Sequence, residues 1–329
     1  MDATRLQAYL TDIPGWNKAV VADVELIGAG WESKIYAFTA TLPDVTLHLA
    51  LRMYTGSDGP YKAQVESGGM PRLRTMGYPV PQVFLYELDA ATLGLPFIDM
   101  DRIFGSQLWD EMRRQPDQRA AYEKGFIDLL VELHRLDWKP FLGDQPIPQN
   151  SHDLIRRDLA LWRDMVTAIP VTGFGDGLHW FESRLAAVTP SSPAVVHNDF
   201  HPANVLVTQD TSAFVIDWTS LGVGDPRSDL AWTLMLVEFE DGPEARQRIQ
   251  RRYEAELATT DLDYFMAGAY VKRLYSLVAS LTHGPETLGM RAGAANEMRN
   301  HLERADGIYN EFRRITGERL TGFEELTSR

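Results

Sequence analysis

The chain of 329 residues contains no cysteine. This absence excludes disulfide bonds and thiolate metal sites, and it favours a reducing compartment. The first residues, MDATRLQAYLTDIPGW, lack the basic and apolar regions of a secretory signal. The longest uncharged apolar run, LAWTLMLV, is far shorter than the ~20 residues that a membrane-spanning helix needs. We therefore expect a cytoplasmic protein with no membrane partner.

A basic patch is also missing from the sequence. The formal net charge is −14, and no basic patch is evident. Nucleic-acid binding normally requires such a patch, so we expect no nucleic-acid partner. An acidic surface keeps a protein in solution, and it would also suit a cationic small substrate. No obligatory protein partner is evident, and the oligomeric state is left open.

The first hundred residues have the alternation of apolar and polar side chains that is typical of β-strands. We expect strands within residues 23–30, 33–40, 45–54, 77–88 and 93–103, and one helix at about 61–76. From about Ser106 onward, long amphipathic helices are predicted instead, as in QRAAYEKGFIDLLVELHRLDW.

Separate sheet-rich and helix-rich parts predict an α+β fold. We place the boundary so that residues 1–101 form a sheet with one main helix and residues 102–329 form the helical part. A ligand is expected in the crevice between two such parts.

One segment combines several oxygen-bearing side chains. In NVLVTQDTSAFVIDW we expect a β-hairpin with the loop QDTS. If Thr208 pairs with Ala213, paired positions sum to 421, and Asn204 lies directly opposite Asp217. Asp199 is close by in the sequence. Two carboxylates and an amide suit a hard cation such as Mg²⁺. The alternative is that Asn204 and Asp217 only cap the ends of the hairpin.

Two histidines flank Asp199 in the segment VVHNDFHPAN. His197 and His201 have the spacing of a helical zinc site, but the glutamate of H-E-x-x-H is missing and Pro202 will not continue a helix. We expect His197 to be buried and to orient the loop. His201 is expected to form a hydrogen bond near the site.

The order of these motifs carries a family resemblance. H-x-D followed by four residues and Asn, then I-D-W, then G-D-P-x-x-D-L-A, all occur between residues 195 and 232. The chain resembles the aminoglycoside phosphotransferase-like kinases, a branch of the protein-kinase-like fold that includes choline, homoserine and fructosamine kinases. The resemblance extends over residues 23–232. It implies a bilobal fold with an antiparallel-sheet N-lobe and a mostly helical C-lobe.

The resemblance also implies a Mg²⁺-dependent kinase. Such an enzyme transfers the terminal phosphoryl group of ATP or GTP to a hydroxyl of an aminoglycoside-like antibiotic, another natural product or a metabolite, with antibiotic resistance as one candidate role. Asp199 would be the catalytic base, and Asn204 and Asp217 would hold Mg²⁺. Asp225 and Asp229 would support the catalytic loop.

The same resemblance assigns a nucleotide site to the N-lobe. Gly28, Gly30 and Ser33 lie where a phosphate-covering turn belongs, although G-x-G in a hairpin needs no function and no P-loop motif occurs in the chain. Met100, Asp101 and Arg102 correspond to the inter-lobe hinge, where Asp101 and Arg102 would offer backbone groups to the base.

One residue departs from the family pattern. The kinase motif V-A-x-K maps onto LALR, so that Ala50 would admit the base and Arg52 stands where lysine is usual. Arginine can bind phosphate through two nitrogens. Glu66 is its candidate partner. The alternatives are that Arg52 is a solvated strand residue and that Glu66 occupies an exposed helix position.

The acceptor site is expected in the helical C-lobe. The acidic cluster of Glu238, Glu240 and Asp241 would meet an amine-bearing substrate, or it is a solvated helix end. Aromatic side chains at helical spacing could line a pocket or belong to the core: Trp232, Tyr264, Tyr270 and Tyr275.

The sequence leaves two other functions to consider, a pseudokinase and a protein kinase. A nucleotide-binding pseudokinase is suggested only by Arg52. A protein kinase is disfavoured, because Trp218 and Thr219 follow Asp217 and no A-P-E motif comes after them.

Overall fold

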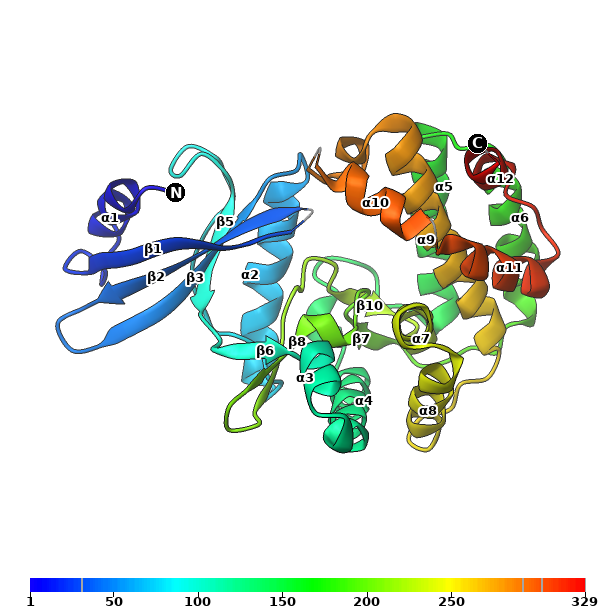
Figure 1. Cartoon of the computed structure of the whole chain (residues 1–329), viewed down its shortest axis with the longest axis horizontal. Coiled ribbons are helices and arrows are strands. Elements are labelled where there is room, and N and C mark those ends of the chain that lie inside the picture. Colours follow the sequence, from blue (N-terminus) through cyan, green and yellow to red (C-terminus); the bar gives the residue numbers. More distant parts are fainter. Residues whose placement is uncertain (31, 292, 303, 329) are drawn as a thin grey trace. The chain divides into compact units, whose positions relative to one another are not determined.

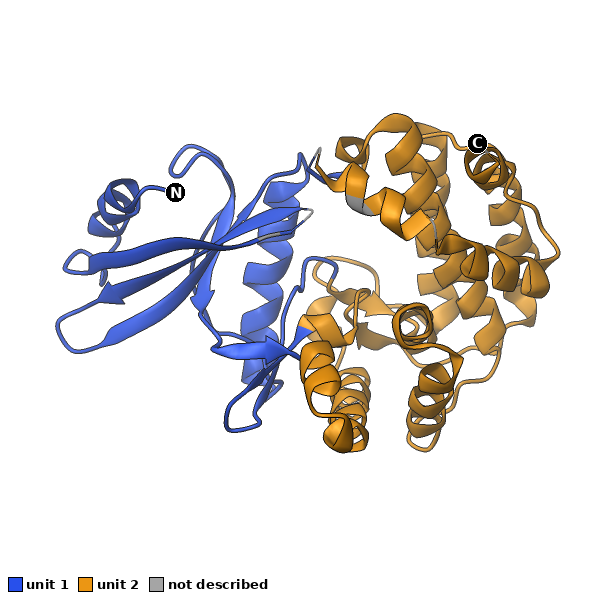
Figure 2. Cartoon of the chain, viewed as in Figure 1, with its two compact units in different colours: residues 1–107, 205–220, 289–291 blue, residues 108–204, 221–288, 292–329 orange. Residues whose placement is uncertain are grey.

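The computed structural model describes residues 1–30, 32–291, 293–302 and 304–328, and it divides into two compact units (Figure 2). Unit 1 comprises Met1–Gln107, Val205–Ser220 and Gly289–Arg291, and unit 2 comprises Leu108–Asn204, Leu221–Leu288 and Ala292–Arg329. The single boundary expected after Asp101 therefore differs from this division.

The hairpin that follows Asn204 belongs to unit 1 because its backbone bonds there. Its strand β8 (Val205–Thr208) pairs with β6 (Gly105–Gln107), and the Val215 N–H donates to the Pro79 carbonyl at 2.8 Å. A segment that follows the expected catalytic loop (residues 197–204) in the sequence thus completes the sheet-rich unit.

Unit 1 is built on a five-stranded antiparallel sheet with the strand order β1-β2-β3-β5-β4 (Figure 1). The strands are β1 (Val20–Ala29), β2 (Ser33–Thr41), β3 (Thr46–Tyr54), β4 (Val83–Glu87) and β5 (Phe97–Asp101). They lie within or close to the segments expected from alternation, and the expected α+β class is confirmed. One helix, α2 (Gly59–Thr75), matches the expected helix, and its first turn contains proline, which is compatible with that position.

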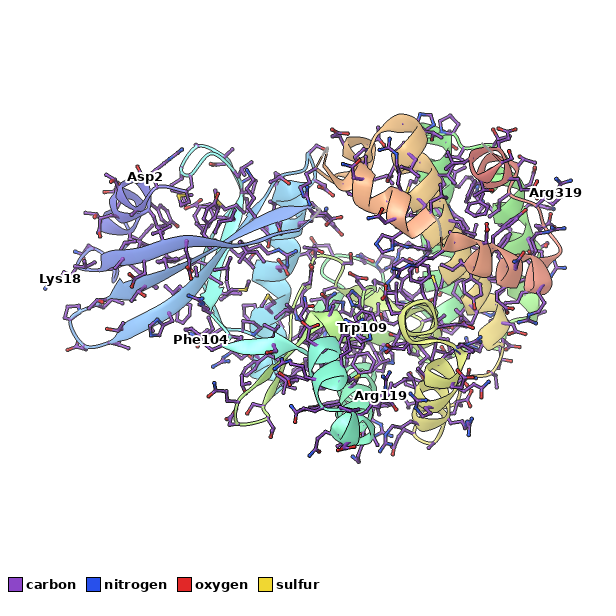
Figure 3. The ribbon with its side chains drawn as sticks, in the orientation of Figure 1. Asp2, Lys18, Phe104, Trp109, Arg119 and Arg319 are labelled. Atoms are coloured by element: carbon purple, nitrogen blue, oxygen red, sulfur yellow. The ribbon has the colours of Figure 1, made fainter. Side chains whose placement is uncertain are left out.

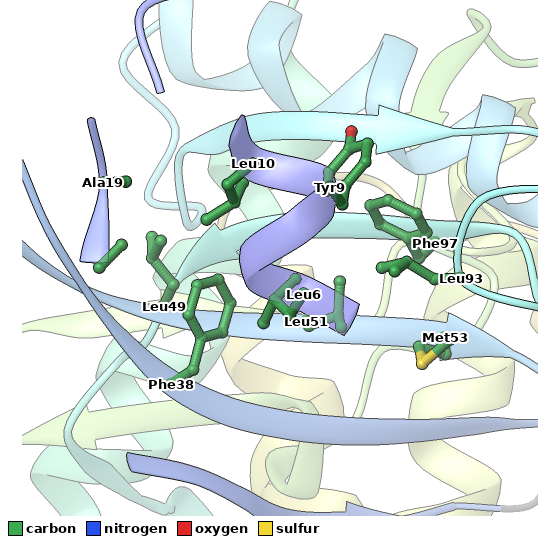
Figure 4. Packing of buried hydrophobic residues seen from close by; sticks show 11 residues of the cluster. Leu6, Tyr9, Leu10, Ala19, Phe38, Leu49, Leu51, Met53, Leu93 and Phe97 are labelled. Atoms are coloured by element: carbon green, nitrogen blue, oxygen red, sulfur yellow. The ribbon is translucent and has the colours of Figure 1, made fainter. Parts of the chain in front are cut away.

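The short helix α1 (Ala3–Thr11) covers one face of this sheet. Leu6 and Leu10 of α1 point toward Leu49 and Leu51 of β3 (Figure 4). Because side chains alternate along a strand, Ala50 and Arg52 must project to the opposite face. The alternation of side chains along LHLALRMY therefore places the leucines in the core and Ala50 and Arg52 on the face of the candidate site.

The hairpin of β8 and β9 (Ala213–Val215) has a different register from the expected one. Val207 pairs with Ala213, so paired positions sum to 420. The Thr208 N–H donates to the Ser212 carbonyl at 2.9 Å, and Thr211 has a φ of 66°. A three-residue loop that ends in a left-handed residue replaces the expected four-residue loop.

This shift corrects the geometric argument for the metal site. Asp217 is not the register partner of Asn204, and the expectation that the two lie directly opposite each other is wrong. Asp217 instead follows the end of β9 in the left-handed region, with a φ of 67°.

Unit 2 is mostly helical. Its helices are α3 (Leu108–Arg114), α4 (Arg119–Arg135), α5 (Ser151–Ala168), α6 (Phe174–Arg184), α7 (Pro226–Asp241), α8 (Pro243–Glu254), α9 (Leu262–His283), α10 (Ala294–Leu302), α11 (Ala305–Thr316) and α12 (Thr321–Thr327). The long, largely buried α9 packs against both α7 and α11. A two-stranded sheet of β7 (Ala194–Val196) and β10 (Gly222–Gly224) brackets the catalytic loop in the sequence. Within the described residues, no helix combines the length and apolarity required to cross a membrane.

Unit 1 contains a buried carboxylate. Asp99 of β5 pairs with Leu51, so it shares the face that α1 covers, and among the described residues neither of its carboxylate oxygens has a side-chain hydrogen-bond partner. Burial raises the pKa of Asp99 well above its ordinary value, and the nearby Asp101 raises it further. The folded protein therefore favours the protonated, neutral form of this side chain.

We expect Asp99 to make the protein less stable as the pH rises. Below the ordinary aspartate pKa, the neutral Asp99 makes its full contribution to the free energy of unfolding. This contribution is lost as the pH rises from the ordinary pKa toward the higher pKa of Asp99 in the folded protein, at about 1.4 kcal/mol for each pH unit. Asp99→Asn cannot ionise, so urea unfolding from about pH 5 to about pH 8 should show wild type losing stability relative to this variant. Parallel curves for the two proteins would contradict this prediction.

Candidate active site

Arg52 is the centre of a buried network in unit 1. Its Nη1 lies 3.1 Å from Glu66 Oε1, and its Nη2 lies 2.7 Å from Asp217 Oδ1. Its Nε donates to Ser33 Oγ at 3.2 Å. Only 6% of the Arg52 side chain and 1% of the Glu66 side chain are exposed. The alternatives of a solvated strand arginine and an exposed helix glutamate are therefore wrong.

Glu66 connects this network to the segment after β9. Its Oε1 also accepts the Trp218 N–H at 2.7 Å, and its Oε2 accepts the Tyr54 hydroxyl. Burial raises the pKa of Glu66, and the guanidinium of Arg52 opposes that shift. One carboxylate on α2 thus holds both Arg52 and the backbone next to Asp217.

Asp217 is held by its neighbours in an uncommon backbone conformation. A positive φ in a residue other than glycine is costly and persists where the surroundings stabilise it. Arg52 and the Thr219 hydroxyl, at 3.2 Å, both donate to its Oδ1. Burial by itself lowers the pKa of Arg52, but the carboxylates of Asp217 and Glu66 raise it above its ordinary value. The arginine therefore stays charged and serves as the counter-ion of the metal-ligand candidate.

The face of the sheet opposite α1 has small side chains next to Arg52. Ala50 pairs with Ala37 on one side and with Met100 on the other, and all three are buried. Gly28 lies opposite Ile35 at the end of this face, and Gly30 is exposed. Two of these three side chains are alanines, so this part of the face has short side chains.

Asp101 and Arg102, the residues expected to offer backbone groups to a base, have fewer free backbone groups than expected. The Asp101 N–H donates to the Gln82 carbonyl and the Arg102 N–H donates to the His48 carbonyl, both at 2.9 Å. These two donors are used within unit 1. Contacts of Asp101 and Arg102 with a base are thereby restricted to their carbonyl oxygens.

The catalytic loop of unit 2 is anchored by Asp229. Its two carboxylate oxygens accept the N–H groups of His197 and Asn198, each at 2.8 Å. His134 Nε2 lies 3.3 Å from the same carboxylate, which is fully buried. His197 is also fully buried, and its Nδ1 lies 3.3 Å from the Asp199 backbone nitrogen.

Asp199 presents a carboxylate that is held on both sides. Its Oδ1 accepts the Trp232 indole N–H at 2.8 Å. Asn204 Nδ2 donates to the Asp199 carbonyl at 2.9 Å and, more weakly, to Oδ2 at 3.3 Å. His201 Nε2 lies 3.6 Å from Oδ2, and 41% of the Asp199 side chain remains exposed. The loop thus holds an oriented carboxylate that a substrate can reach.

Asp225 has a role at the start of α7. It caps the helix by accepting the Arg227 N–H, and it forms an ion pair with the Arg227 guanidinium at 2.7 Å. Ser191 donates to the same carboxylate at 2.9 Å. This side chain fixes the helix from which Asp229 and Trp232 project.

The acidic cluster after α7 already holds cations of its own unit. Asp241 accepts the indole N–H of Trp109 on α3 and pairs with Arg119 on α4, both at 2.9 Å (Figure 3). Glu238 pairs with Arg246 at 3.2 Å, and Glu240 lies 3.9 Å from both Arg113 and Arg304. All three acids thus lie against arginines of their own unit, and binding of an amine-bearing substrate by this cluster stays a prediction.

The aromatic candidates divide in the same way. Tyr264, Tyr270 and Tyr275 are buried and donate to groups of their own unit, so they belong to the core. Trp232 is different, because it contacts Asp199. The sequence contained a signal for this contact, since Trp232 lies three residues after Asp229 and so shares its helix face.

We expect Arg52→Lys to destabilise the protein by about 1–3 kcal/mol, because one ammonium cannot reach Ser33, Glu66 and Asp217 as a planar guanidinium does. The measurement is urea unfolding of both proteins. Arg102→Lys is the matched control, because Arg102 forms an exposed pair with Glu25 and its replacement should cost less than about 1 kcal/mol. Equal losses in the two variants would refute the central role of Arg52.

Comparisons with known proteins agree with this geometry. Residues 23–263 match the model of the phosphotransferase enzyme family. The Gallus gallus protein "Acyl-CoA dehydrogenase family member 11" is 26% identical over 167 residues, which are 49% of this chain and 21% of that protein. The chain therefore spans about a fifth of the length of this curated relative.

Solved structures show the same fold. The GDP and kanamycin complex of APH(2")-IIia is 16% identical with a TM-score of 0.63, and it covers 92% of this chain and 97% of that one. A macrolide 2'-phosphotransferase type I is 17% identical with a TM-score of 0.61, covering 90% and 96%. The expected aminoglycoside-phosphotransferase-like fold is confirmed. Since the family model matches most of the sequence, the chain belongs to the phosphotransferase enzyme family.

Proposed function

We propose that the protein transfers the terminal phosphoryl group of ATP or GTP to a hydroxyl of a small molecule, with Asp199 as the base. The observation that carries this proposal is the Asp199 carboxylate, which is held by Trp232 and Asn204 and remains reachable by a substrate. The bond between the terminal phosphorus and the bridging oxygen breaks, and the nucleoside diphosphate leaves. The acceptor oxygen bonds to phosphorus, and its proton passes to Asp199.

The residues present fit a magnesium ion. Asn204 Nδ2 donates to two oxygens of Asp199, so the amide oxygen of Asn204 is the group that would bind a cation. Asp217 adds a carboxylate, and amide and carboxylate oxygens are the ligands that Mg²⁺ prefers. When bound, Mg²⁺ neutralises charge on the nucleotide phosphates. We assign Asn204 and Asp217 to hold it.

We assign nucleotide binding to the sheet face of unit 1 that carries Ala50, Met100 and Arg52, with Gly28 and Gly30 at the adjoining turn. Arg52 supplies the positive charge that lysine provides elsewhere in the family. One solved relative is a complex with GDP and another is a complex with AMP-PNP. These complexes support a purine nucleoside triphosphate as donor and leave both ATP and GTP as candidates.

The acceptor is proposed to be an aminoglycoside-like antibiotic, another natural product or a metabolite. Relatives are named with kanamycin, hygromycin B and macrolides, all of which are natural products that bear hydroxyl groups. Glu238, Glu240 and Asp241 are proposed to meet an amine-bearing acceptor, in exchange for their present contacts with arginines of unit 2. The deciding experiment is a screen of hydroxyl compounds with ATP and with GTP, in which phosphorylated product is detected by mass.

A nucleotide-binding pseudokinase is the second candidate. The direct bond of Arg52 to Asp217 favours it, because the arginine already neutralises a metal ligand. Mg²⁺-dependent nucleotide binding without product from any acceptor would support the pseudokinase, and phosphorylated product would exclude it.

Asp199→Ala should abolish transfer, lowering kcat by about 100-fold or more, because the carboxylate assigned to take the proton is lost. Binding of the Mg²⁺–nucleotide complex, measured by calorimetry, should stay within about twofold of wild type. Near-normal turnover of the variant would show that Asp199 is not the base.

Asp217→Asn should weaken binding of the Mg²⁺–nucleotide complex by at least about tenfold, or 1.4 kcal/mol, because a metal-ligand charge is lost. The asparagine keeps the shape of the side chain next to Arg52. Calorimetry with chelator present is the control, because nucleotide binding without Mg²⁺ should not weaken. Equal weakening with and without Mg²⁺ would argue against a metal-binding role.

A further inference from the structure

Side chains on one face of α7 form hydrogen bonds with successive residues of the loop that carries Asp199. Asp229, Trp232 and Thr233 have the i, i+3, i+4 spacing that places side chains on the same side of a helix. Asp229 accepts the N–H groups of His197 and Asn198, as described above. The Thr233 hydroxyl donates to the Phe200 carbonyl at 2.7 Å.

Trp232 differs from the other two because it contacts a side chain. Asp229 and Thr233 bond the loop backbone, whereas the Trp232 indole donates to the Asp199 carboxylate at 2.8 Å. An indole N–H is a donor only, so Trp232 cannot itself exchange a proton with the acceptor. Its effect on the reaction must pass through the orientation of Asp199.

We propose that Trp232 is a positioning residue for the base: it occupies Asp199 Oδ1, so that Oδ2 is the oxygen that takes the acceptor's proton. This inference rests on the proposed function. The two oxygens are held unequally, since Oδ1 has a 2.8 Å hydrogen bond and Oδ2 has only a 3.3 Å contact with Asn204 and a 3.6 Å contact with His201. A short bond to an ionised oxygen withdraws electron density, which leaves the other oxygen as the better proton acceptor.

Without this bond, the carboxylate would rotate. Asp199 is 41% exposed, so water competes for it and several side-chain conformations become accessible. A catalytic group works best when it is already oriented toward the reacting atom. Trp232 therefore contributes to turnover and not to binding of either substrate.

The test is Trp232→Phe, which keeps an aromatic ring and removes the N–H. We expect kcat to fall by about 10- to 100-fold, the range for a lost hydrogen bond to a charged group, with both KM values within about twofold of wild type. Trp232→His, which keeps a ring N–H, should recover part of the loss. Unchanged kcat, or a loss that appears only in KM, would overturn the proposal.

Trp180→Phe is the matched control. Trp180 is a buried tryptophan of unit 2, and its indole nitrogen has no hydrogen-bond partner among the described residues. The same substitution there should leave kcat unchanged. A fall in kcat as large as that of Trp232→Phe would mean that loss of an indole in unit 2 has a general structural effect, and it too would overturn the proposal.

A second measurement separates this inference from the proposed function. The indole N–H resonance of Trp232 is identified by its loss in Trp232→Phe, among the resonances of the eight tryptophans. It should move in Asp199→Ala, while that of Trp180 stays in place. If the wild type yields no product from any acceptor, the proposed function fails, and this spectrum alone decides whether Trp232 holds Asp199. An unmoved Trp232 resonance would overturn the inference even in an active enzyme.

Discussion

A charged arginine inside unit 1 must be surrounded by acceptors, and this requirement organises the candidate nucleotide side of the protein. Alternation along β3 turns Arg52 away from the α1 core, toward the face that carries α2. A buried guanidinium without partners would be strongly unfavourable, so Glu66 and Asp217 lie against it. Because Glu66 also bonds the Trp218 N–H, the segment after β9 has both its backbone and its acidic side chain fixed by the same network.

In unit 2, the backbone of an irregular loop needs hydrogen-bond partners. Its catalytic loop contains Asn198 with a positive φ, so its backbone groups cannot be satisfied by regular secondary structure. Side chains of α7 supply the missing partners, with a carboxylate for two N–H groups and a hydroxyl for one carbonyl. The result is a rigid helix that holds an irregular loop, which is a common arrangement for reactive groups. In each unit, a regular element positions a residue that does not itself belong to one.

The sequence predicted the fold class, the strands and the candidate site, because these depend on local patterns. Strand alternation is set by adjacent residues, and the motif from His197 to Asp229 is contiguous enough to read directly. The hairpin register failed, because it depends on a left-handed Thr211 and on Asp210, whose side chain bonds both Thr208 and Ser212.

The arginine partners of the acidic cluster after α7 could not be predicted, for another reason. Asp241 is neutralised by Arg119, which is 122 residues away in the chain, and no sequence pattern shows such a pair. Pairs of this kind arise only from packing between helices.

Arg52 is the opposite case. As a departure from the family pattern it suggests a loss of function, but a planar guanidinium has donors pointing in several directions, and here they reach Ser33, Glu66 and Asp217 together. A lysine carries its three donors on one nitrogen, so it would not span the separate positions of Ser33, Glu66 and Asp217 in the same way. Arg52 therefore connects Ser33 after the glycine turn, Glu66 on α2 and the metal-ligand candidate Asp217 in one hydrogen-bond network. The residue that departs from the family pattern is thus the one that holds this part of the site together.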